Sequence, residues 1–242
     1  MNNILLKAKK KLKRILKKKN SYIEDEFYQK LFIENKKWNT SAPNYDENLR
    51  WATIEKFLFF IKGYNSANSL HDKKNNILDV GCGRGWLSNL LMLYGNVIGI
   101  EPVKSVVEYG KNLFPSLDLR VGVPQDLLNK YTSHFDIIVC SEVIEHIPDE
   151  QKLSFLNNLK ALLKPNGFLI LTTPRKDAET EWKKYGDTAQ PIEDWPFEET
   201  IAKLFSEIGF QKLLLKRLPM SPAKKAPLID IYQLWLAQKH KL

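Results

Sequence analysis

The spacing of apolar positions along the chain changes near residue 75. Before that point apolar residues recur at helical period, most clearly from Asp46 to Ile61. After it, short apolar runs such as Ile77 to Val80 and Phe135 to Cys140 alternate with segments of helical period. Strands that alternate with helices are typical of a parallel sheet covered on both faces. The pattern therefore predicts an α/β core preceded by helices.

The same pattern predicts the individual elements. The predicted strands are residues 77–80, 97–100, 117–121, 135–140, 168–173, 210–218 and 228–237. The predicted helices are residues 24–38, 46–61, 86–94, 103–114, 124–131 (a helix or a loop), 150–163 and 197–208. Because residues 63–74 are polar and loop-like, we divide the chain into a basic amphipathic helix at 1–20, a helical cap at 21–74 and a core domain at 75–242. The last two strands are expected to form a closing hairpin.

A glycine-rich turn follows the first predicted strand. Gly81, Gly83 and Gly85 remove side-chain bulk there, a helix begins directly afterwards, and Glu101 ends the second strand. Such a turn lets a ligand lie against the backbone, and the helix N-terminus offers N–H groups to an anion. An acid at the tip of the second strand can accept hydrogen bonds from a ribose diol. This stretch is therefore predicted to be half of a nucleotide-binding fold.

Asp79 distinguishes between two cofactors for such a fold. The turn reads D-x-G-x-G-x-G, whereas the dinucleotide fingerprint is G-x-G-x-x-G. A carboxylate just before the turn would repel a pyrophosphate but attract a cationic amino group. S-adenosylmethionine carries an ammonium, a carboxylate and a sulfonium, and has no phosphate. The sequence thus favours S-adenosylmethionine over a dinucleotide.

Length and composition restrict the class of protein to which this chain can belong. A chain of 242 residues with 43% hydrophobic residues suits one α/β domain with an extension. No apolar run reaches the ~18–20 residues of a membrane-spanning helix and no secretory-type stretch is present, so we expect a cytoplasmic protein. Cys82 and Cys140 have no partner at metal-ligand spacing, and both are expected to be small turn or core residues.

The net charge of +9 comes from one end of the chain. Residues 1–20 hold nine of the 37 Lys and Arg and no acid, which leaves 28 basic and 28 acidic residues in the rest. A nucleic-acid-binding surface would more naturally spread positive charge over a domain face, so nucleic acid is not the expected partner. The basic amphipathic pattern of residues 4–19 suits an anionic membrane surface. A solvated helix and a protein or nucleic-acid partner remain open for this segment.

Three stretches together resemble class I S-adenosylmethionine-dependent methyltransferases. They are Ile-Leu-Asp-Val-Gly-Cys-Gly-Arg-Gly at 77–85, Glu-Val-Ile-Glu-His at 142–146, and Leu-Lys-Pro-Asn-Gly-Phe-Leu-Ile-Leu-Thr-Thr-Pro at 163–174. The second is similar to the corresponding segment of ubiquinone-biosynthesis O-methyltransferases. The third looks like the fifth-strand signature, where Pro-Asn-Gly makes the turn. The resemblance implies a Rossmann-like, doubly wound α/β fold with a seven-stranded, mostly parallel sheet, an antiparallel last strand and an N-terminal helical extension.

The resemblance also implies which residues bind the cofactor. Asp79, Gly81 and Gly83 would flank its methionine end. Glu101 would bind the ribose hydroxyls, and Pro102 would lie against the adenine. The expected set is Asp79, Gly81, Cys82, Gly83, Glu101, Pro102, Gln125, Asp126, Ser141 and Arg50.

Two members of this set have structural alternatives. Asp126 would lie near the adenine amine, but its loop departs from the usual Gly-Asp start, and a helix N-terminal cap is the other interpretation. Arg50 could pair with the cofactor carboxylate bidentately, or could be an exposed helix residue. Arg50 and Tyr45 belong to a helix that we expect to cap the site.

Residues 141–149 follow the fourth strand and would face the transferable methyl group. Methyl transfer from a sulfonium requires the acceptor to be aligned, kept dry and deprotonated. A histidine with an ordinary pKa near ~6.5 is largely neutral at pH 7, so His146 is a candidate base; it can instead only orient the loop. Glu142 and Glu145 complete the expected catalytic set.

The same E-x-x-E-H segment is similar to one in small-RNA 3′-terminal 2′-O-methyltransferases, where another histidine completes a divalent-metal site. No histidine follows the fifth strand within residues 175–196, so no metal ligand is assigned here. A partial site with water or substrate oxygens stays open.

We therefore expect an S-adenosylmethionine-dependent methyltransferase that acts on an oxygen of a small molecule or of a glycan or lipid-linked intermediate. The alternatives are an RNA 2′-O-methyltransferase and a non-catalytic cofactor-binding scaffold. Trp182, Tyr185 and Trp195 are candidates for a substrate lid or for packing against the core.

Overall fold

The computed structural model places the apolar runs in strands and the amphipathic segments in helices. It describes residues 25–67, 74–186 and 190–240, so the basic segment at 4–19 lies outside the described residues. The strands are β1 (Asn75–Val80), β2 (Gly95–Glu101), β3 (Asp118–Val121), β4 (Phe135–Ser141), β5 (Leu163–Pro174), β6 (Phe210–Met220) and β7 (Ile229–Lys239). The helices are η1 (Lys30–Glu34), α2 (Tyr45–Ala67), α3 (Trp86–Leu91), α4 (Lys104–Leu113), α5 (Pro124–Tyr131), η2 (Ile144–His146), α6 (Asp149–Leu162), α7 (Lys176–Trp182) and α8 (Glu198–Ile208).

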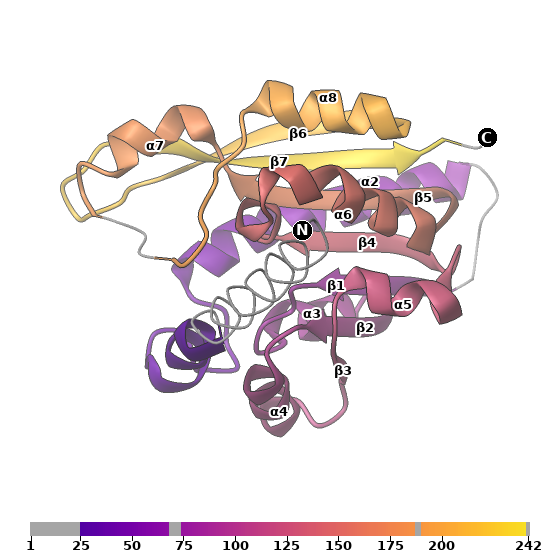
Figure 1. Ribbon diagram of the computed structural model, residues 1–242, viewed down its shortest axis with the longest axis horizontal. Helices are drawn as coiled ribbons and strands as arrows, with labels where there is room; N and C mark the ends of the chain where they lie inside the picture. The colour runs from indigo at the N-terminus through magenta and orange to yellow at the C-terminus, as the bar shows by residue number, and fades with distance from the viewer. Residues whose placement is uncertain (1–24, 68–73, 187–189, 241–242) are drawn as a thin grey trace, which may run out of the picture.

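These strands form one sheet in the order β3-β2-β1-β4-β5-β7-β6 (Figure 1). The pairs from β3 to β5 are parallel, whereas β7 is antiparallel to both of its neighbours. The chain runs outward from β1 to β3 and then returns to β4 on the other side of β1. The order therefore switches between β1 and β4, where open α/β sheets bind ligands at the carboxyl ends of their strands. The predicted doubly wound sheet, with an antiparallel last strand and a closing hairpin, is confirmed.

Successive side chains along the central strands point to opposite faces of the sheet, and both faces are apolar. In β4, Ile138 and Cys140 belong to a core with α5, α6 and α8, whereas Ile137 and Val139 belong to one with α2 and α3. In Figure 1, α5, α6 and α8 lie in front of the sheet and α2 and α3 lie behind it. Burial on both faces explains why β4 is a continuous apolar run in the sequence.

Helix α2 covers the sheet as well as reaching the site. Its side chains Ile54, Phe57, Leu58 and Ile61 are buried in the core behind the sheet. The sequence predicted a cap separated from the core by a loop from residue 63, but the helix continues to Ala67. Tertiary contact explains the difference, because Tyr64 packs edge-on against Phe168 of β5 with ring centroids 5.7 Å apart. Each buried aliphatic or aromatic side chain contributes about 1.5–3 kcal/mol, which fixes α2 relative to the sheet.

Two other predicted boundaries differ from the structure. Residues 165–167 lie inside β5 and not in a turn before it. The register shifts there, because Phe135 pairs with Leu163 whereas Ile137 pairs with Phe168. Asn166 absorbs the extra length with a left-handed φ of 63°, which asparagine tolerates better than most residues. Helix α7 forms within residues 175–196, which the sequence pattern left irregular.

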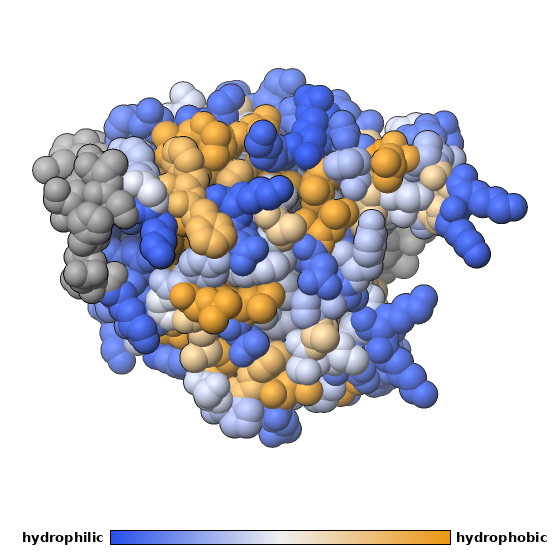
Figure 2. Space-filling model, turned by 180° about the vertical axis from the view of Figure 1, so that it is seen from behind, coloured by the Kyte–Doolittle hydropathy of each residue, from blue (hydrophilic) through white to orange (hydrophobic). Residues whose placement is uncertain are grey.

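The face behind the sheet carries exposed apolar side chains. Phe59, Phe60 and Tyr64 on α2 and Leu93 after α3 are among them. Figure 2 shows that the apolar areas of this face are interrupted by hydrophilic residues. Within the described ranges, no helix combines the length and the apolar character needed to cross a membrane.

Candidate active site

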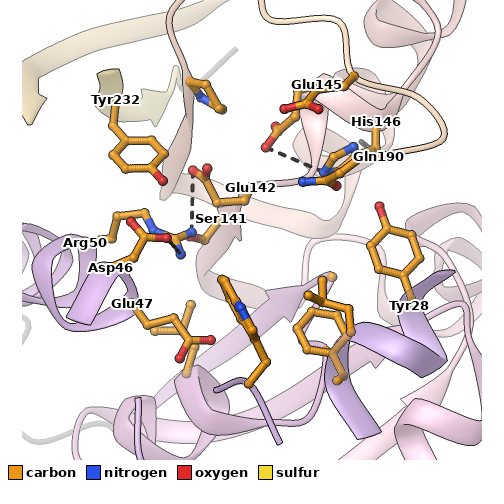
Figure 3. Close-up of a pocket in the computed structure, with 18 of the residues that line it drawn as sticks. Tyr28, Asp46, Glu47, Arg50, Ser141, Glu142, Glu145, His146, Gln190 and Tyr232 are labelled. Carbon is orange, nitrogen blue, oxygen red and sulfur yellow. Dashed lines mark hydrogen bonds and ion pairs between the residues drawn. The ribbon is translucent and has the colours of Figure 1, made fainter. Parts of the chain in front are cut away.

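A cavity of about 340 Å³ opens at the carboxyl ends of β1, β4 and β5, beside the switch in strand order. This volume is at the lower end of the range for small-molecule sites. Three groups of residues line it: Asp79, Gly81, Cys82 and Gly83 at the end of β1 and in the turn that follows, Ser141, Glu142, Glu145 and His146 at the end of β4 and in the loop that follows, and Asp46, Glu47 and Arg50 on α2. Tyr28, Phe32 and Trp38, which precede α2 in the chain, also line the cavity. Figure 3 shows Arg50 and Asp46 on one side of the cavity, with Glu145 and His146 on the other.

The glycine-rich turn favours glycine at two positions that line this cavity. Gly81 and Gly83 have φ of 69° and 51°, in the left-handed region. A Cβ atom on Gly81 would lie 2.4 Å from Cγ2 of Val143, so the turn packs directly against the loop after β4. A Cβ atom on Gly83 would lie 3.2 Å from the Phe32 ring. The glycines thus allow both neighbouring segments to close on the turn.

Two buried carboxyl groups lie at the ends of β1 and β2. Asp79 accepts a hydrogen bond from the Ser88 hydroxyl at 2.6 Å, and burial raises the pKa of Asp79 to about 7. Glu101 accepts from the Val103 N–H at 3.1 Å and the Gly83 N–H at 3.3 Å, and burial raises the pKa of Glu101 to about 7. Among the described residues neither carboxyl has an ion-pair partner. Both are therefore suited to a ligand that supplies a cation or hydroxyl donors.

Arg50 is buried at the site, which excludes the exposed-helix alternative. It is 5% exposed, donates from Nη2 to Asp46 Oδ2 at 3.0 Å, and places Nη1 3.7 Å from Glu142 Oε1. Its guanidinium also lies 5.3 Å from the centroid of the Tyr232 ring. Arg50 Nε and Asp46 Oδ1 are buried without a hydrogen-bond partner. An unpaired buried group costs about 1–3 kcal/mol, so a ligand that satisfies both atoms would gain affinity.

The loop after β4 is held by hydroxyl groups of β5. The Thr172 hydroxyl donates to Glu142 Oε1 at 2.7 Å, and the Thr173 hydroxyl donates to Glu145 Oε2 at 2.9 Å. Ser141 Oγ lies 2.8 Å from the Thr172 hydroxyl oxygen. Burial raises the pKa of both Glu142 and Glu145 well above the usual range of a carboxyl group. The predicted strand signature therefore positions the predicted catalytic segment.

His146 has a defined tautomer in this arrangement. Its Nδ1 lies 2.7 Å from the backbone oxygen of Ile192, and a carbonyl oxygen only accepts, so Nδ1 carries the proton. In the neutral ring the lone pair is then on Nε2, which lies 3.8 Å from Glu145 Oε1. The Tyr28 ring packs edge-on against the imidazole at a centroid distance of 6.1 Å.

A buried ion pair that the sequence analysis missed joins the turn to α2. Arg84, fully buried, donates from Nη1 and Nη2 to the two carboxylate oxygens of Glu47 at 2.7 and 2.8 Å. It also donates to the backbone oxygens of Thr40 at 2.6 Å and Ala42 at 3.2 Å. Glu47 in turn accepts from the Asn44 N–H at 2.8 Å, while Asn44 Oδ1 accepts from the Glu47 N–H at 2.9 Å. This Asn-x-x-Glu capping box was readable in the sequence.

Several predicted residues do not reach the cavity. Glu101, Pro102, Gln125 and Asp126 are not among its lining residues, and the last three are exposed. Asp126 instead accepts a hydrogen bond from the Val123 N–H at 2.9 Å and caps α5, which is the alternative that the sequence left open. Their cofactor roles stay predictions.

The three candidate lid residues also differ in whether they reach the cavity. Trp182 and Trp195 line the cavity, whereas Tyr185 does not and is half-exposed. Tyr45 is 76% exposed and does not line the cavity, whereas Asp46, Glu47 and Arg50 from the first two turns of α2 do. Gln190, Glu193 and Tyr232 line the cavity without having been predicted, and no local motif marks them. Within the described part of the chain, no three His, Cys, Asp or Glu side chains are arranged to hold a metal ion.

Comparison with known proteins gives a family match and partial relatives. A family model described as a methyltransferase domain matches residues 46–215. A ubiquinone biosynthesis O-methyltransferase of Coxiella burnetii is 38% identical over 105 residues, which is 42% of this chain and 44% of that protein. One of Actinobacillus pleuropneumoniae is 39% identical over 116 residues, which is 44% of this chain and 48% of that protein. The match thus spans less than half the length of these curated relatives.

Solved structures show the same fold. A 1,6-didemethyltoxoflavin-N1-methyltransferase of Burkholderia thailandensis, solved with 1,6-didemethyltoxoflavin and S-adenosylhomocysteine, aligns with a TM-score of 0.63 at 17% identity, over 93% of this chain and 90% of that one. A SAM-dependent methyltransferase of Methanosarcina mazei aligns with a TM-score of 0.59 at 18% identity, over 73% of this chain and 97% of that one. At identities this low, the similarity shows that the folds are alike and nothing more.

The Arg84–Glu47 pair yields a stability prediction. Arg84→Met should lower the free energy of unfolding by about 3–5 kcal/mol, because it leaves the buried Glu47 carboxylate without its partner. Adding Glu47→Gln should cost little more, since the pair acts as a unit. Urea unfolding of the single and double variants measures both effects. As a control, Arg217→Met removes an exposed partner of Glu198 and should lower the free energy of unfolding by no more than about 1 kcal/mol. If the losses of the Arg84 and Glu47 single variants added fully in the double variant, the two residues would not be coupled.

The partly buried Glu142 carboxyl yields a pH prediction. Its pKa is higher in the folded than in the unfolded protein, so at intermediate pH the folded state holds a proton that the unfolded state has released. Stability from this group is therefore complete below the unfolded pKa and is lost as pH rises through the folded pKa, by up to about 1.4 kcal/mol per pH unit. Glu142→Gln should flatten the decline in melting temperature between pH 5 and pH 8. The exposed Glu199→Gln is the matched control, and identical slopes for both variants would refute this effect.

Proposed function

The chain belongs to the family of proteins with a methyltransferase domain, and on that premise we propose that it transfers the methyl group of S-adenosylmethionine to an oxygen of a small-molecule acceptor. The observation that carries this proposal is the cavity at the switch in strand order. There, the buried Asp79 carboxyl and the Arg50 guanidinium line the same cavity as Glu142, Glu145 and His146, and Arg50 Nε is without a hydrogen-bond partner. The site thus combines charges for a zwitterion with a candidate base.

The residues present fit S-adenosylmethionine. The orphaned Arg50 Nε suits the carboxylate of its methionine end, and the unpaired Asp46 Oδ1 and the Asp79 carboxyl suit its ammonium. The backbone of Gly81 and Gly83, free of side chains, allows the cofactor to lie against the turn. When bound, the cofactor supplies a methyl group already activated by a sulfonium. Cys82 and Ser141 would complete this end of the site, and Glu101 would accept from the ribose hydroxyls.

His146 would remove the proton from the acceptor hydroxyl. Its Nε2 has the lone pair because Nδ1–H donates to the Ile192 carbonyl oxygen, so Nε2 would accept the proton of the acceptor hydroxyl. The methyl group would come from the sulfonium of the bound cofactor, which would be left as a neutral thioether. Glu145 lies 3.8 Å from Nε2 and would stabilise the resulting imidazolium. The buried loop and Trp195 limit access of water to this proton transfer.

Two observations support oxygen as the acceptor atom. The curated relatives are named O-methyltransferases and match this chain at 38–39% identity over part of their length. A hydroxyl acceptor needs a base, and the geometry offers one at Nε2 of His146. The N1-methyltransferase of Burkholderia thailandensis is similar in fold alone, at 17% identity, and carries no argument about the acceptor atom.

Cofactor binding should depend on pH through Asp79. Because the pKa of Asp79 is about 7, its carboxyl must lose a proton to hold an ammonium, so affinity for S-adenosylmethionine should rise by about tenfold from pH 6 to pH 8 and then level. Asp79→Asn should weaken binding at pH 8 and remove this rise. Calorimetry across pH measures both. Asp118→Asn, an exposed change on β3, should alter neither, and unchanged affinity in Asp79→Asn would overturn the cofactor assignment.

Turnover should depend on His146 separately from cofactor binding. His146→Ala should reduce kcat by about 10²–10⁴-fold, because the acceptor proton loses its base, while the Kd for S-adenosylmethionine stays within about twofold. His134→Ala, at the opposite end of β4, should leave kcat unchanged. The pH profile should also lose its lower limb in His146→Ala. Full activity of this variant would reduce His146 to a structural role.

A further inference from the structure

Lys152, on α6, is buried to an extent that is unusual for a lysine. Its side chain is 2% exposed, and lysines are almost never fully buried unless they are paired. It is not among the residues that line the cavity, and the chemistry described above does not use it. The reason for its burial therefore lies in the groups that its ammonium holds.

Each of the three N–H bonds of the Lys152 ammonium has an acceptor. Nζ donates to Asp149 Oδ1 at 2.6 Å, to Asp194 Oδ2 at 2.9 Å and to the Asp194 backbone oxygen at 3.2 Å. A lysine ammonium has three donors, so this set satisfies it completely. Two of the three bonds go to Asp194, which is 42 residues further along the chain. Lys152 thus binds α6 to the segment that contains Asp194.

That segment, residues 190–196, has no helix or strand of its own. Its position therefore depends on hydrogen bonds to neighbouring elements. Its far end is held by Gln233 of β7, whose Nε2 donates to the Pro196 oxygen at 2.8 Å. Three of its side chains line the cavity: Gln190, Glu193 and Trp195. Figure 3 shows Gln190 next to His146 on the same side of the cavity.

The same segment carries the hydrogen-bond acceptor that orients His146. The Asp194 N–H donates to the Glu145 backbone oxygen at 2.8 Å. Two residues before Asp194, the Ile192 carbonyl oxygen lies 2.7 Å from His146 Nδ1. The hydrogen bond at one ring nitrogen of a histidine sets which nitrogen carries the proton. The position of the Ile192 carbonyl therefore sets the tautomer of His146, and Lys152 holds the residue two positions away.

Taking the methyl-transfer function proposed above as the basis on which this step rests, we propose that Lys152 is a positioning residue for His146. The ammonium acts through Asp194, whose fixed position keeps the Ile192 carbonyl against Nδ1 and keeps the ring in the Nδ1–H tautomer. Without the ammonium the segment loses its bonds to α6, and the ring populates both tautomers. Small displacements of a reacting group can reduce a rate by about a hundredfold, so such positioning matters for a base.

The two aspartates that share the ammonium allow positioning to be separated from burial. Asp149 belongs to α6 itself, three residues before Lys152, and its side chain is 76% exposed. Asp194 belongs to the segment that holds His146, and its side chain is 42% exposed. Asp149→Ala and Asp194→Ala each remove one carboxylate from the same ammonium. Only the second change loosens the segment, so the two variants form a matched pair.

The tautomer of His146 is the quantity that tests this role. Nuclear magnetic resonance of nitrogen-15-labelled protein shows which ring nitrogen is protonated at pH 8, where an imidazole of ordinary pKa is neutral. His146→Ala identifies the His146 signals by their loss. The wild-type chain should show the Nδ1–H tautomer. In Lys152→Met and Asp194→Ala, the ratio of Nδ1–H to Nε2–H should fall by about fivefold or more, since a hydrogen bond of ordinary strength corresponds to about that factor. Asp149→Ala should leave the ratio unchanged.

These variants should keep the fold and the affinity for the cofactor. Methionine has a stem similar to that of lysine, and both aspartates can be hydrated when the ammonium is removed. The Kd for S-adenosylmethionine should stay within about twofold of the wild-type value, because Asp79 and Arg50 are unchanged. If Lys152→Met does not fold, Asp194→Ala gives the same test at a more exposed position.

The outcomes separate this proposal from the function on which it rests. An unchanged tautomer ratio in both Lys152→Met and Asp194→Ala would overturn the positioning role. An equal shift in Asp149→Ala and Asp194→Ala would also overturn it, because the ammonium would then not act through the segment. The proposed function fails by a different measurement, namely if the wild-type chain does not bind S-adenosylmethionine in calorimetry.

Discussion

The arrangement of the site depends on one buried ion pair. Arg84, within the glycine-rich turn, holds both oxygens of Glu47 and two backbone oxygens of the segment before α2. A guanidinium taken from water is stable only with such complete pairing, so the turn and the start of α2 form as a unit. The first two turns of the same helix place Asp46 and Arg50 in the lining of the cavity. One contact thus couples the glycine-rich turn to the charged side chains of α2 that line the cavity.

A second constraint is the burial of carboxyl groups that have few cationic partners. Asp79 and Glu101, each with a pKa raised to about 7, are held by a hydroxyl and by backbone N–H groups. Glu142 and Glu145 are held by adjacent threonines of β5. Hydrogen bonds from hydroxyl groups stabilise these carboxyl groups in the interior without adding a positive charge. The carboxyl groups therefore still favour a ligand that brings a cation or a proton donor. Buried carboxyl groups of this kind suit a cationic cofactor such as S-adenosylmethionine.

Much of this could be predicted from local pattern, and some could not. The sheet and its hairpin follow from apolar runs, and the turn with Asp79 and the Glu142–His146 segment follow from short motifs. Asp126 is a residue whose role the sequence could not decide. Its position suited both a contact with the cofactor and a helix cap, and only the hydrogen bond that it accepts from the Val123 N–H shows that it caps α5. The membrane contact expected for residues 4–19 and the cofactor roles of Pro102 and Gln125 stay predictions.

The sequence by itself determined the order of strands and helices and the chemistry of the turn, because periodicity and glycine placement act over a few residues. Only the tertiary structure decided which distant side chains share the cavity. Arg50 could be exposed or buried on an amphipathic helix, and the packing of α2 behind the sheet placed it beside Glu142. Glu193 has no motif, and it reaches the site because Lys152 and the Glu145 backbone hold its segment against the loop after β4. Contacts between residues so far apart in sequence depend on the sheet order and on buried pairing, which no short stretch encodes.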